Sequence, residues 1–211
     1  MTALEPRPPA PARLLPKPAD WGVRAPSFIL AHHYACLGVD SGNTELPVSQ
    51  LLYALAIANR SQTIVETGIN NFAGASLWLV EAARINDGTY TGFDISYDPC
   101  VRAARLLTQL EPSPNATIIH GDALIEVPAR FSPGTIDLLF VDDCHKRLHV
   151  EREIAAFRPL MRPNGLMLFH DVLGVHESDI WDVLAALGGV RLATHPHEGK
   201  HFGGLGMLPC P

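Results

Sequence analysis

With 211 residues, of which 47% are hydrophobic, the chain can bury one sizeable core, which favours one main domain over two. The formal charge of -6 would repel a phosphate backbone and argues against a nucleic-acid partner. The sequence contains no long apolar run, no signal-like N-terminus and no CxxC pair among its four cysteines, so we expect no membrane partner and a cytoplasmic protein with reduced thiols.

The first 60 residues divide into two predicted segments. Six prolines between Pro6 and Pro18 would deny a helix its backbone donors, so residues 1–20 are expected to be a flexible tail. Residues 21–60 are predicted to be a helical region that could lid a pocket, because LPVSQLLYALAIANR places leucines on one helical face. Residues 61–211 are expected to form the main domain, which would carry any catalytic site.

From residue 61 onward, short apolar runs alternate with helical segments. Strands are predicted at residues 63–66, 90–95, 117–120, 136–141, 166–170, 190–194 and 204–208. Helices separate the first five strands, among them residues 76–85, 98–110 and 149–161. This alternation predicts an α/β fold: a Rossmann-like, doubly wound and mostly parallel sheet of about seven strands, flanked by helices, with the last strand antiparallel.

Acidic side chains lie at the end of nearly every predicted strand or just beyond it. They are Glu66, Asp94, Asp122, Asp142 and Asp171. In a doubly wound sheet, ligands bind outside the carboxyl ends of the strands. Any one of these carboxylates could be a helix cap or a loop residue, but their recurrence in register indicates a ligand site.

The turn from Gly68 to Gly74 limits the class of ligand. Glycines allow close approach of the backbone, and a following helix supplies free N–H donors. The turn lacks GxGxxG and GK[ST], so we expect a nucleoside without a pyrophosphate. Asp94, 20 residues after Gly74, can accept both ribose hydroxyls. Asp122 could accept an adenine amino group or simply cap a helix.

The segments ETGINNFAGAS, GFDIS, HGDAL, FVDDCH and RPLMRPNGLMLFHDV resemble the successive motifs of class I S-adenosylmethionine-dependent methyltransferases. They are most similar to the macrolide-sugar and catechol-like O-methyltransferases of that family. The resemblance implies S-adenosylmethionine as cofactor and methyl transfer to a hydroxyl of a small molecule, such as a secondary metabolite or a sugar. Asp143 and Asn164 depart from the pattern, because each stands where the family usually has a glycine.

The resemblance also implies roles for individual residues. The expected cofactor-binding residues are Glu66, Gly68, Asn70, Gly74, Ser76, Asp94, Ile95, Asp122, Ala123 and Asp142. Glu66, Gly68 and Gly74 would line the methionine and ribose portion of the cofactor. Asp122 and Ala123 would line its adenine.

Methyl transfer requires a nucleophile that is close, aligned and deprotonated. Histidine titrates near neutral pH, so His145, just beyond Asp142, is the predicted catalytic base, with a structural role as the alternative. Asp142 is expected beside the methyl donor as the second catalytic residue. Asp142 and Asp171 could also bind Mg²⁺ through oxygen, although the flanking His170 is a poor magnesium ligand.

Other functions stay open at this point. A nicotinamide-dependent oxidoreductase shares the sheet and the ribose carboxylate but needs GxGxxG, and a macromolecule methyltransferase needs a basic docking face. A non-catalytic nucleoside-binding subunit needs only the fold. The segment HPHEGKH, with His195, His197 and His201, is interpreted as a polar loop rather than a transition-metal site. A homodimer is compatible with the sequence.

Overall fold

The structure is a computed structural model that describes residues 27–36, 44–71, 73–108, 115–173, 180–193 and 203–210. The predicted tail at residues 1–20 and the histidines of the HPHEGKH segment lie outside these ranges.

The described strands are β1 (Thr63–Thr67), β2 (Thr89–Asp94), β3 (Ala116–His120), β4 (Ile136–Val141), β5 (Met161–His170), β6 (Val190–Ala193) and β7 (Leu205–Pro209). The helices are α1 (Ser27–Cys36), α2 (Leu46–Ala58), α3 (Gly74–Ile85), α4 (Tyr97–Leu107), α5 (Ala123–Arg130), α6 (Arg147–Phe157), the 3-10 helix η1 (Arg158–Leu160) and α7 (Ile180–Ala186). Among the described helices, none has both the length and the apolar composition needed to cross a membrane.

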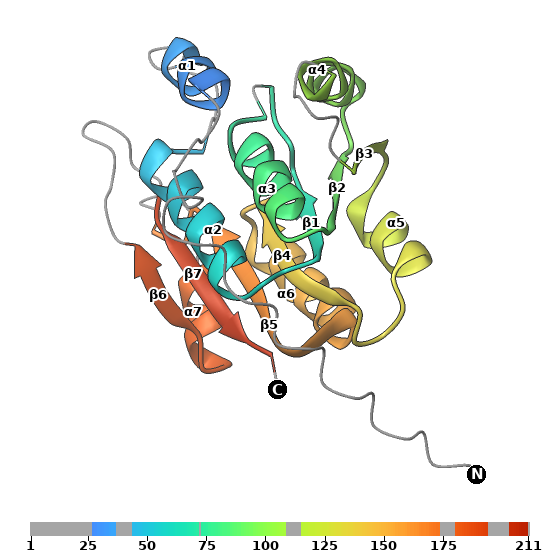
Figure 1. The fold of residues 1–211 in the computed structure, drawn as a ribbon. Coiled ribbons are helices and arrows are strands. Elements are labelled where there is room, and N and C mark those ends of the chain that lie inside the picture. Colours follow the sequence, from blue (N-terminus) through green and yellow to red (C-terminus); the bar gives the residue numbers. More distant parts are fainter. Residues whose placement is uncertain are drawn as a thin grey trace.

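The strands form one seven-stranded sheet in the order β3-β2-β1-β4-β5-β7-β6 (Figure 1). The pairs from β3 across to β5 are parallel, whereas β7 runs antiparallel to both β5 and β6. The predicted fold class, including the antiparallel last strand, is confirmed. β1 is the central strand of the parallel part, with β2 on one side and β4 on the other. The carboxyl ends of these three strands therefore lie next to one another at one edge of the sheet.

Alternating side chains of the central strands enter two separate cores. In β4, Leu138 and Phe140 pack in the core that α2 and α3 complete, whereas Leu139 and Val141 pack in the core of α5, α6 and α7. Figure 1 shows α2 and α3 on one face of the sheet and α6 and α7 on the other. Burial on both faces is the reason that β4 is apolar at every position except Asp137.

One predicted helix was wrong at its C-terminal end. The helix expected over residues 149–161 stops at Phe157, and after η1 the strand β5 already starts at Met161. Met161 pairs with Ile136, and the register then shifts before the strand continues. The shift accommodates Pro163, which cannot donate a hydrogen bond to a sheet ladder.

The predicted start of the helix expected at residues 98–110 was also wrong. The sequence predicts Asp98 as the N-cap, but helix α4 begins at Tyr97 with Ser96 at the N-cap position, and Asp98 lies in the first turn. An acidic side chain in the first turn still complements the positive end of the helix dipole.

Helix α2 belongs to the core. Leu52 and Ala56 are fully buried, and the ring of Tyr53 meets that of Trp78 on α3 edge to face at 5.5 Å. The helix thereby fixes the segment just before it, Thr44 and Glu45, near the carboxyl ends of β4 and β5, where both side chains make hydrogen bonds. The predicted division into tail, helical region and catalytic domain stays a prediction.

Candidate active site

A cavity of about 770 Å³ opens at the carboxyl ends of β1 to β4. Seven of the residues expected from the sequence to bind cofactor line it, together with others that the sequence did not indicate. The seven are Gly68, Asn70, Asp94, Ile95, Asp122, Ala123 and Asp142. A cavity of this volume lies within the range of small-molecule and cofactor sites.

Gly68 lets two strand ends approach each other closely. Its φ is +80°, and a Cβ there would lie 2.2 Å from the carbonyl oxygen of Asp142. The N–H of Gly68 donates to the carbonyl of Phe93 at 2.8 Å, and the N–H of Asp142 donates to that of Thr67 at 2.9 Å. Any side chain at this position would therefore separate β1 from β4 at the cavity.

The Asp94 carboxylate is held by the backbone on both oxygens. Oδ2 accepts from the N–H of Asn70 at 3.0 Å, and Oδ1 accepts from that of Ser96 at 2.8 Å. Asn70 has a φ of +61°, a left-handed conformation that asparagine tolerates better than most residues. Since a carboxylate oxygen can accept two hydrogen bonds, each oxygen of Asp94 can still accept one from a ligand in the cavity.

Asp122 has the capping role that the sequence left as one alternative. Its Oδ1 accepts from the N–H of Leu124 at 2.9 Å, as expected for the N-cap of α5. Asp122 also lines the cavity, so the cap and a contact with a ligand are compatible.

Three expected cofactor residues, Glu66, Gly74 and Ser76, do not line the cavity. Gly74 and Ser76 are buried in the first turn of α3. Glu66 is 1% exposed and accepts a hydrogen bond from the hydroxyl of Tyr90. Burial raises the pKa of Glu66 to about 8, and the charges of Asp142 and Asp94 add to this, while the hydrogen bond from Tyr90 opposes it.

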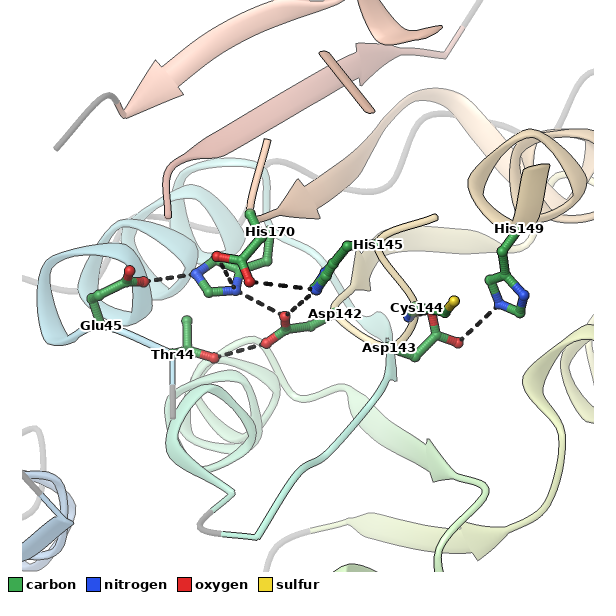
Figure 2. A network of polar contacts seen from close by, with 9 residues as sticks. Thr44, Glu45, Asp142, Asp143, Cys144, His145, His149 and His170 are labelled. Carbon is green, nitrogen blue, oxygen red and sulfur yellow. Dashed lines mark hydrogen bonds and ion pairs between the residues drawn. The ribbon is translucent and has the colours of Figure 1, made fainter. Parts of the chain in front are cut away.

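His170, at the end of β5, lies between two carboxylates (Figure 2). Its Nδ1 donates to Oδ1 of Asp142 at 2.8 Å, and its Nε2 donates to Oε2 of Glu45 at 2.7 Å. Burial lowers the pKa of His170, but the Asp142 charge and the two hydrogen bonds outweigh that effect and raise it well above 6.5. With an acceptor at each nitrogen, the ring is an imidazolium that neutralises part of the acidic cluster.

Asp142 has both oxygens engaged, because its Oδ2 accepts from Oγ1 of Thr44 at 2.9 Å. The predicted base His145 lies beside it: Nε2 is 3.6 Å from Oδ1 of Asp142 and 3.6 Å from Oδ2 of Asp171. Burial raises the pKa of Asp171, and the Asp142 charge adds to it, whereas the two histidines lower it. The structure thus brings Asp142, His145 and Asp171 together.

Sequence reasoning missed several residues of this site. Thr44 and Glu45 are 98 and 125 positions away from their partners Asp142 and His170, so no local pattern connects them. The one signal available was Pro47, which marks the start of α2 and places Glu45 at its N-cap. Missed residues that line the cavity include Asn71, Tyr97, Arg102, Asp143, Cys144 and His149.

The sheet order, the glycine turn and the cavity at the carboxyl edge define a Rossmann-like protein with a ligand site at the ends of its central strands. A family model described as a methyltransferase domain matches residues 65–172, about half of the sequence, and the chain belongs to this family. The family assignment does not favour the nicotinamide-dependent alternative. No curated protein matches the sequence significantly.

Solved structures with the same fold cover nearly the whole chain. A methyltransferase from Geobacter sulfurreducens is similar with a TM-score of 0.67 and 20% identity over 92% of each chain. The O-methyltransferase from Bacillus cereus in complex with SAH gives 0.66 and 15% identity over 90% of this chain and 93% of that one. The O-methyltransferase TomG from Streptomyces achromogenes, involved in tomaymycin synthesis and in complex with SAM, gives 0.63 and 19% over the same shares.

Proposed function

We propose that the protein transfers a methyl group from S-adenosylmethionine (SAM) to a hydroxyl of a small molecule and releases S-adenosylhomocysteine (SAH). The observation that carries this proposal is that Gly68, Asp94 and Asp122, from three different strand ends, line one cavity. The methyltransferase family and the SAM-bound and SAH-bound O-methyltransferases of the same fold support it.

The cofactor binds along the wall from Gly68 to Ala123 in this proposal. Asp94, fixed by two backbone donors, accepts the ribose hydroxyls, and Ile95 lies next to it in the cavity wall. Asp122 and Ala123 lie at the adenine. Glu66, Gly74 and Ser76 shape the turn and the start of α3 without touching the cofactor, because they are buried outside the cavity lining.

His145 is the proposed catalytic base. In the transfer step, the substrate oxygen forms a bond to the methyl carbon, the carbon–sulfur bond breaks with its electron pair going to sulfur, and the hydroxyl proton moves to Nε2 of His145. The carboxylates of Asp142 and Asp171, each 3.6 Å from Nε2, then stabilise the imidazolium that forms. His170 and Thr44 keep Asp142 oriented for this role.

The residues at Asp142 and Asp171 do not fit the Mg²⁺ ion that the sequence suggested. Mg²⁺ demands six oxygen ligands in near-octahedral geometry. Here both oxygens of Asp142 already accept hydrogen bonds, and the neighbouring side chains are the imidazoles of His145 and His170. Because the His170 imidazolium supplies positive charge beside Asp142, we infer methyl transfer that does not require Mg²⁺.

A small acceptor and a cytoplasmic location complete the proposal. The net charge of -6 disfavours polyanionic substrates, and the described cysteines Cys100, Cys144 and Cys210 are free thiols, as in a reducing compartment.

Two experiments test the proposal. The first measures the thermal unfolding temperature in the presence of SAM, SAH or NAD⁺. The second measures transfer of a labelled methyl group from SAM to a panel of catechols and hexose derivatives. We expect SAM and SAH, but not NAD⁺, to raise the unfolding temperature, and at least one panel member to become labelled. Stabilisation by NAD⁺ alone would contradict the proposal.

A further inference from the structure

A second cluster of titratable side chains lies on the other side of the loop that carries Asp142 and His145. It consists of Asp143, His149 and Glu153, whose ligand atoms all lie within 4.8 Å of one another. Figure 2 shows Asp143 and His149 directed toward each other and apart from His145 and His170. The proposed methyl-transfer chemistry uses none of the three.

The three groups converge at distances longer than a hydrogen bond. Nε2 of His149 is 3.6 Å from Oδ2 of Asp143 and 3.8 Å from Oε1 of Glu153. His149 and Glu153 are four residues apart on α6 and therefore share one face of the helix. The N–H of Cys144 donates to Oδ1 of Asp143, which leaves Oδ2 directed at His149.

The carboxyl group of Glu153 is buried, and no hydrogen bond to it is found among the described residues. The residue is 0% exposed, and neither of its oxygens, nor Nε2 of His149, is hydrogen-bonded to any group in the part of the chain that the structure describes. Buried polar atoms are almost always satisfied, so three such atoms pointing at one place indicate a missing binding partner. Since carboxylate oxygens and an unprotonated imidazole nitrogen all offer lone pairs, a cation can serve as that partner.

The spacing matches a transition-metal cation. Ligands about 2.1 Å from a tetrahedral Zn²⁺ ion lie about 3.4 Å from one another, close to the 3.6 Å and 3.8 Å that separate Nε2 of His149 from the two carboxylates. One imidazole and two carboxylates form a donor set for a borderline cation such as Zn²⁺ and a poor one for Mg²⁺.

We propose that Asp143, His149 and Glu153 bind a Zn²⁺ ion in the wall of the cofactor cavity. Asp143 and His149 line that cavity, while Glu153 closes the site from the protein interior. Three protein ligands leave a fourth position open toward the cavity, for water or for a group of a bound ligand. This site is separate from the methyl-transfer residues, and its existence does not depend on the proposed function.

The test uses the full chain without a histidine tag, first treated with a chelator. Zn²⁺ affinity is measured by competition with a chromogenic chelator, and Co²⁺ is used as a visible probe of the ligand geometry. We expect one equivalent of either metal, and Glu153→Gln and His149→Asn should each weaken Zn²⁺ binding at least tenfold. Asp171→Asn, which alters the neighbouring acidic cluster, and the double variant His197→Asn with His201→Asn should bind as the wild type does.

Two results would overturn the proposal. One is wild-type protein that takes up no Zn²⁺ in competition with the chelator, which would mean that Glu153 is simply a protonated acid. The other is Zn²⁺ uptake that survives in both His149→Asn and Glu153→Gln, or that only the control substitutions abolish. If Glu153→Gln does not fold, His149→Asn decides alone, because His149 is partly exposed and its replacement leaves the buried carboxyl in place. Failure here would leave SAH binding unaffected, so the two proposals are tested separately.

Discussion

Nδ1 of His170 lies 2.8 Å from Oδ1 of Asp142, and the opposite nitrogen of the same ring lies 2.7 Å from Glu45. The imidazolium of His170, at the end of β5, thus connects Asp142, which follows β4, to Glu45, which precedes α2. Replacing one partner of such a buried group leaves the other charges uncompensated, which costs more than the pair contributes when it is intact.

His170→Gln should therefore destabilise the protein strongly. The side chains of His170, Asp142 and Glu45 are 6%, 7% and 13% exposed, so solvent screens them little. Breaking a buried ion pair of this kind costs about 3–5 kcal/mol. Urea unfolding measures the change, with His120→Gln, at an exposed position, as the matched control expected to lose less than about 1 kcal/mol. Equal losses for the two variants would argue against the central role of His170.

His145→Gln should separate catalysis from cofactor binding. Loss of a general base lowers turnover by about 10²- to 10⁴-fold. The affinity for SAH should stay within a factor of about two, since His145 does not line the cavity. Labelled methyl transfer and calorimetry measure the two quantities. A loss of SAH affinity as large as the loss of turnover would place His145 in the cofactor site instead.

Glu66→Gln should make stability less dependent on pH. The pKa of Glu66 is about 8 in the folded protein against 4.5 for the ordinary carboxyl. As the pH rises, the unfolded chain therefore loses this proton at a lower pH than the folded chain does. The contribution of Glu66 to stability is complete below pH 4.5 and declines, by at most about 1.4 kcal/mol per pH unit, until the folded pKa is passed. Wild type should thus lose stability relative to Glu66→Gln between pH 5 and 8 in urea unfolding. A relative gain over that range would contradict the raised pKa.

Mg²⁺ should have little effect on turnover. Because His170 and Thr44 occupy both oxygens of Asp142, adding Mg²⁺ to chelator-treated protein is expected to change the rate of labelled methyl transfer by less than about twofold. Mn²⁺ serves as a comparison, since it has similar oxygen preferences. Activation by Mg²⁺ of tenfold or more would show that Asp142 exchanges its hydrogen bonds for a metal ion.

Local sequence patterns predicted the parallel sheet and one wall of the cavity. The β4 strand was predicted with its observed bounds because burial on both faces makes it apolar from Leu138 to Val141, and Gly68 was identified because its turn demands a glycine. Met161 was assigned to a helix because its apolar spacing continues that of α6, whereas its place in β5 is specified only by pairing with Ile136 of β4.

The contacts of the polar network could not be predicted in the same way. Glu45 meets His170 only after α2 packs on α3, and no sequence period links positions 125 residues apart. The direction of the Glu66 side chain could not be predicted either, because the alternation of side chains along β1 places it in the interior, where it accepts a hydrogen bond from Tyr90.

Calorimetric titration with SAH tests the cofactor site most directly. The account predicts one equivalent of SAH bound by the wild type, at least about tenfold weaker binding by Asp94→Ala, and unchanged binding by Asp182→Ala, a control at an exposed position on α7. Undetectable SAH binding by wild-type protein, or equal binding by Asp94→Ala, would contradict it.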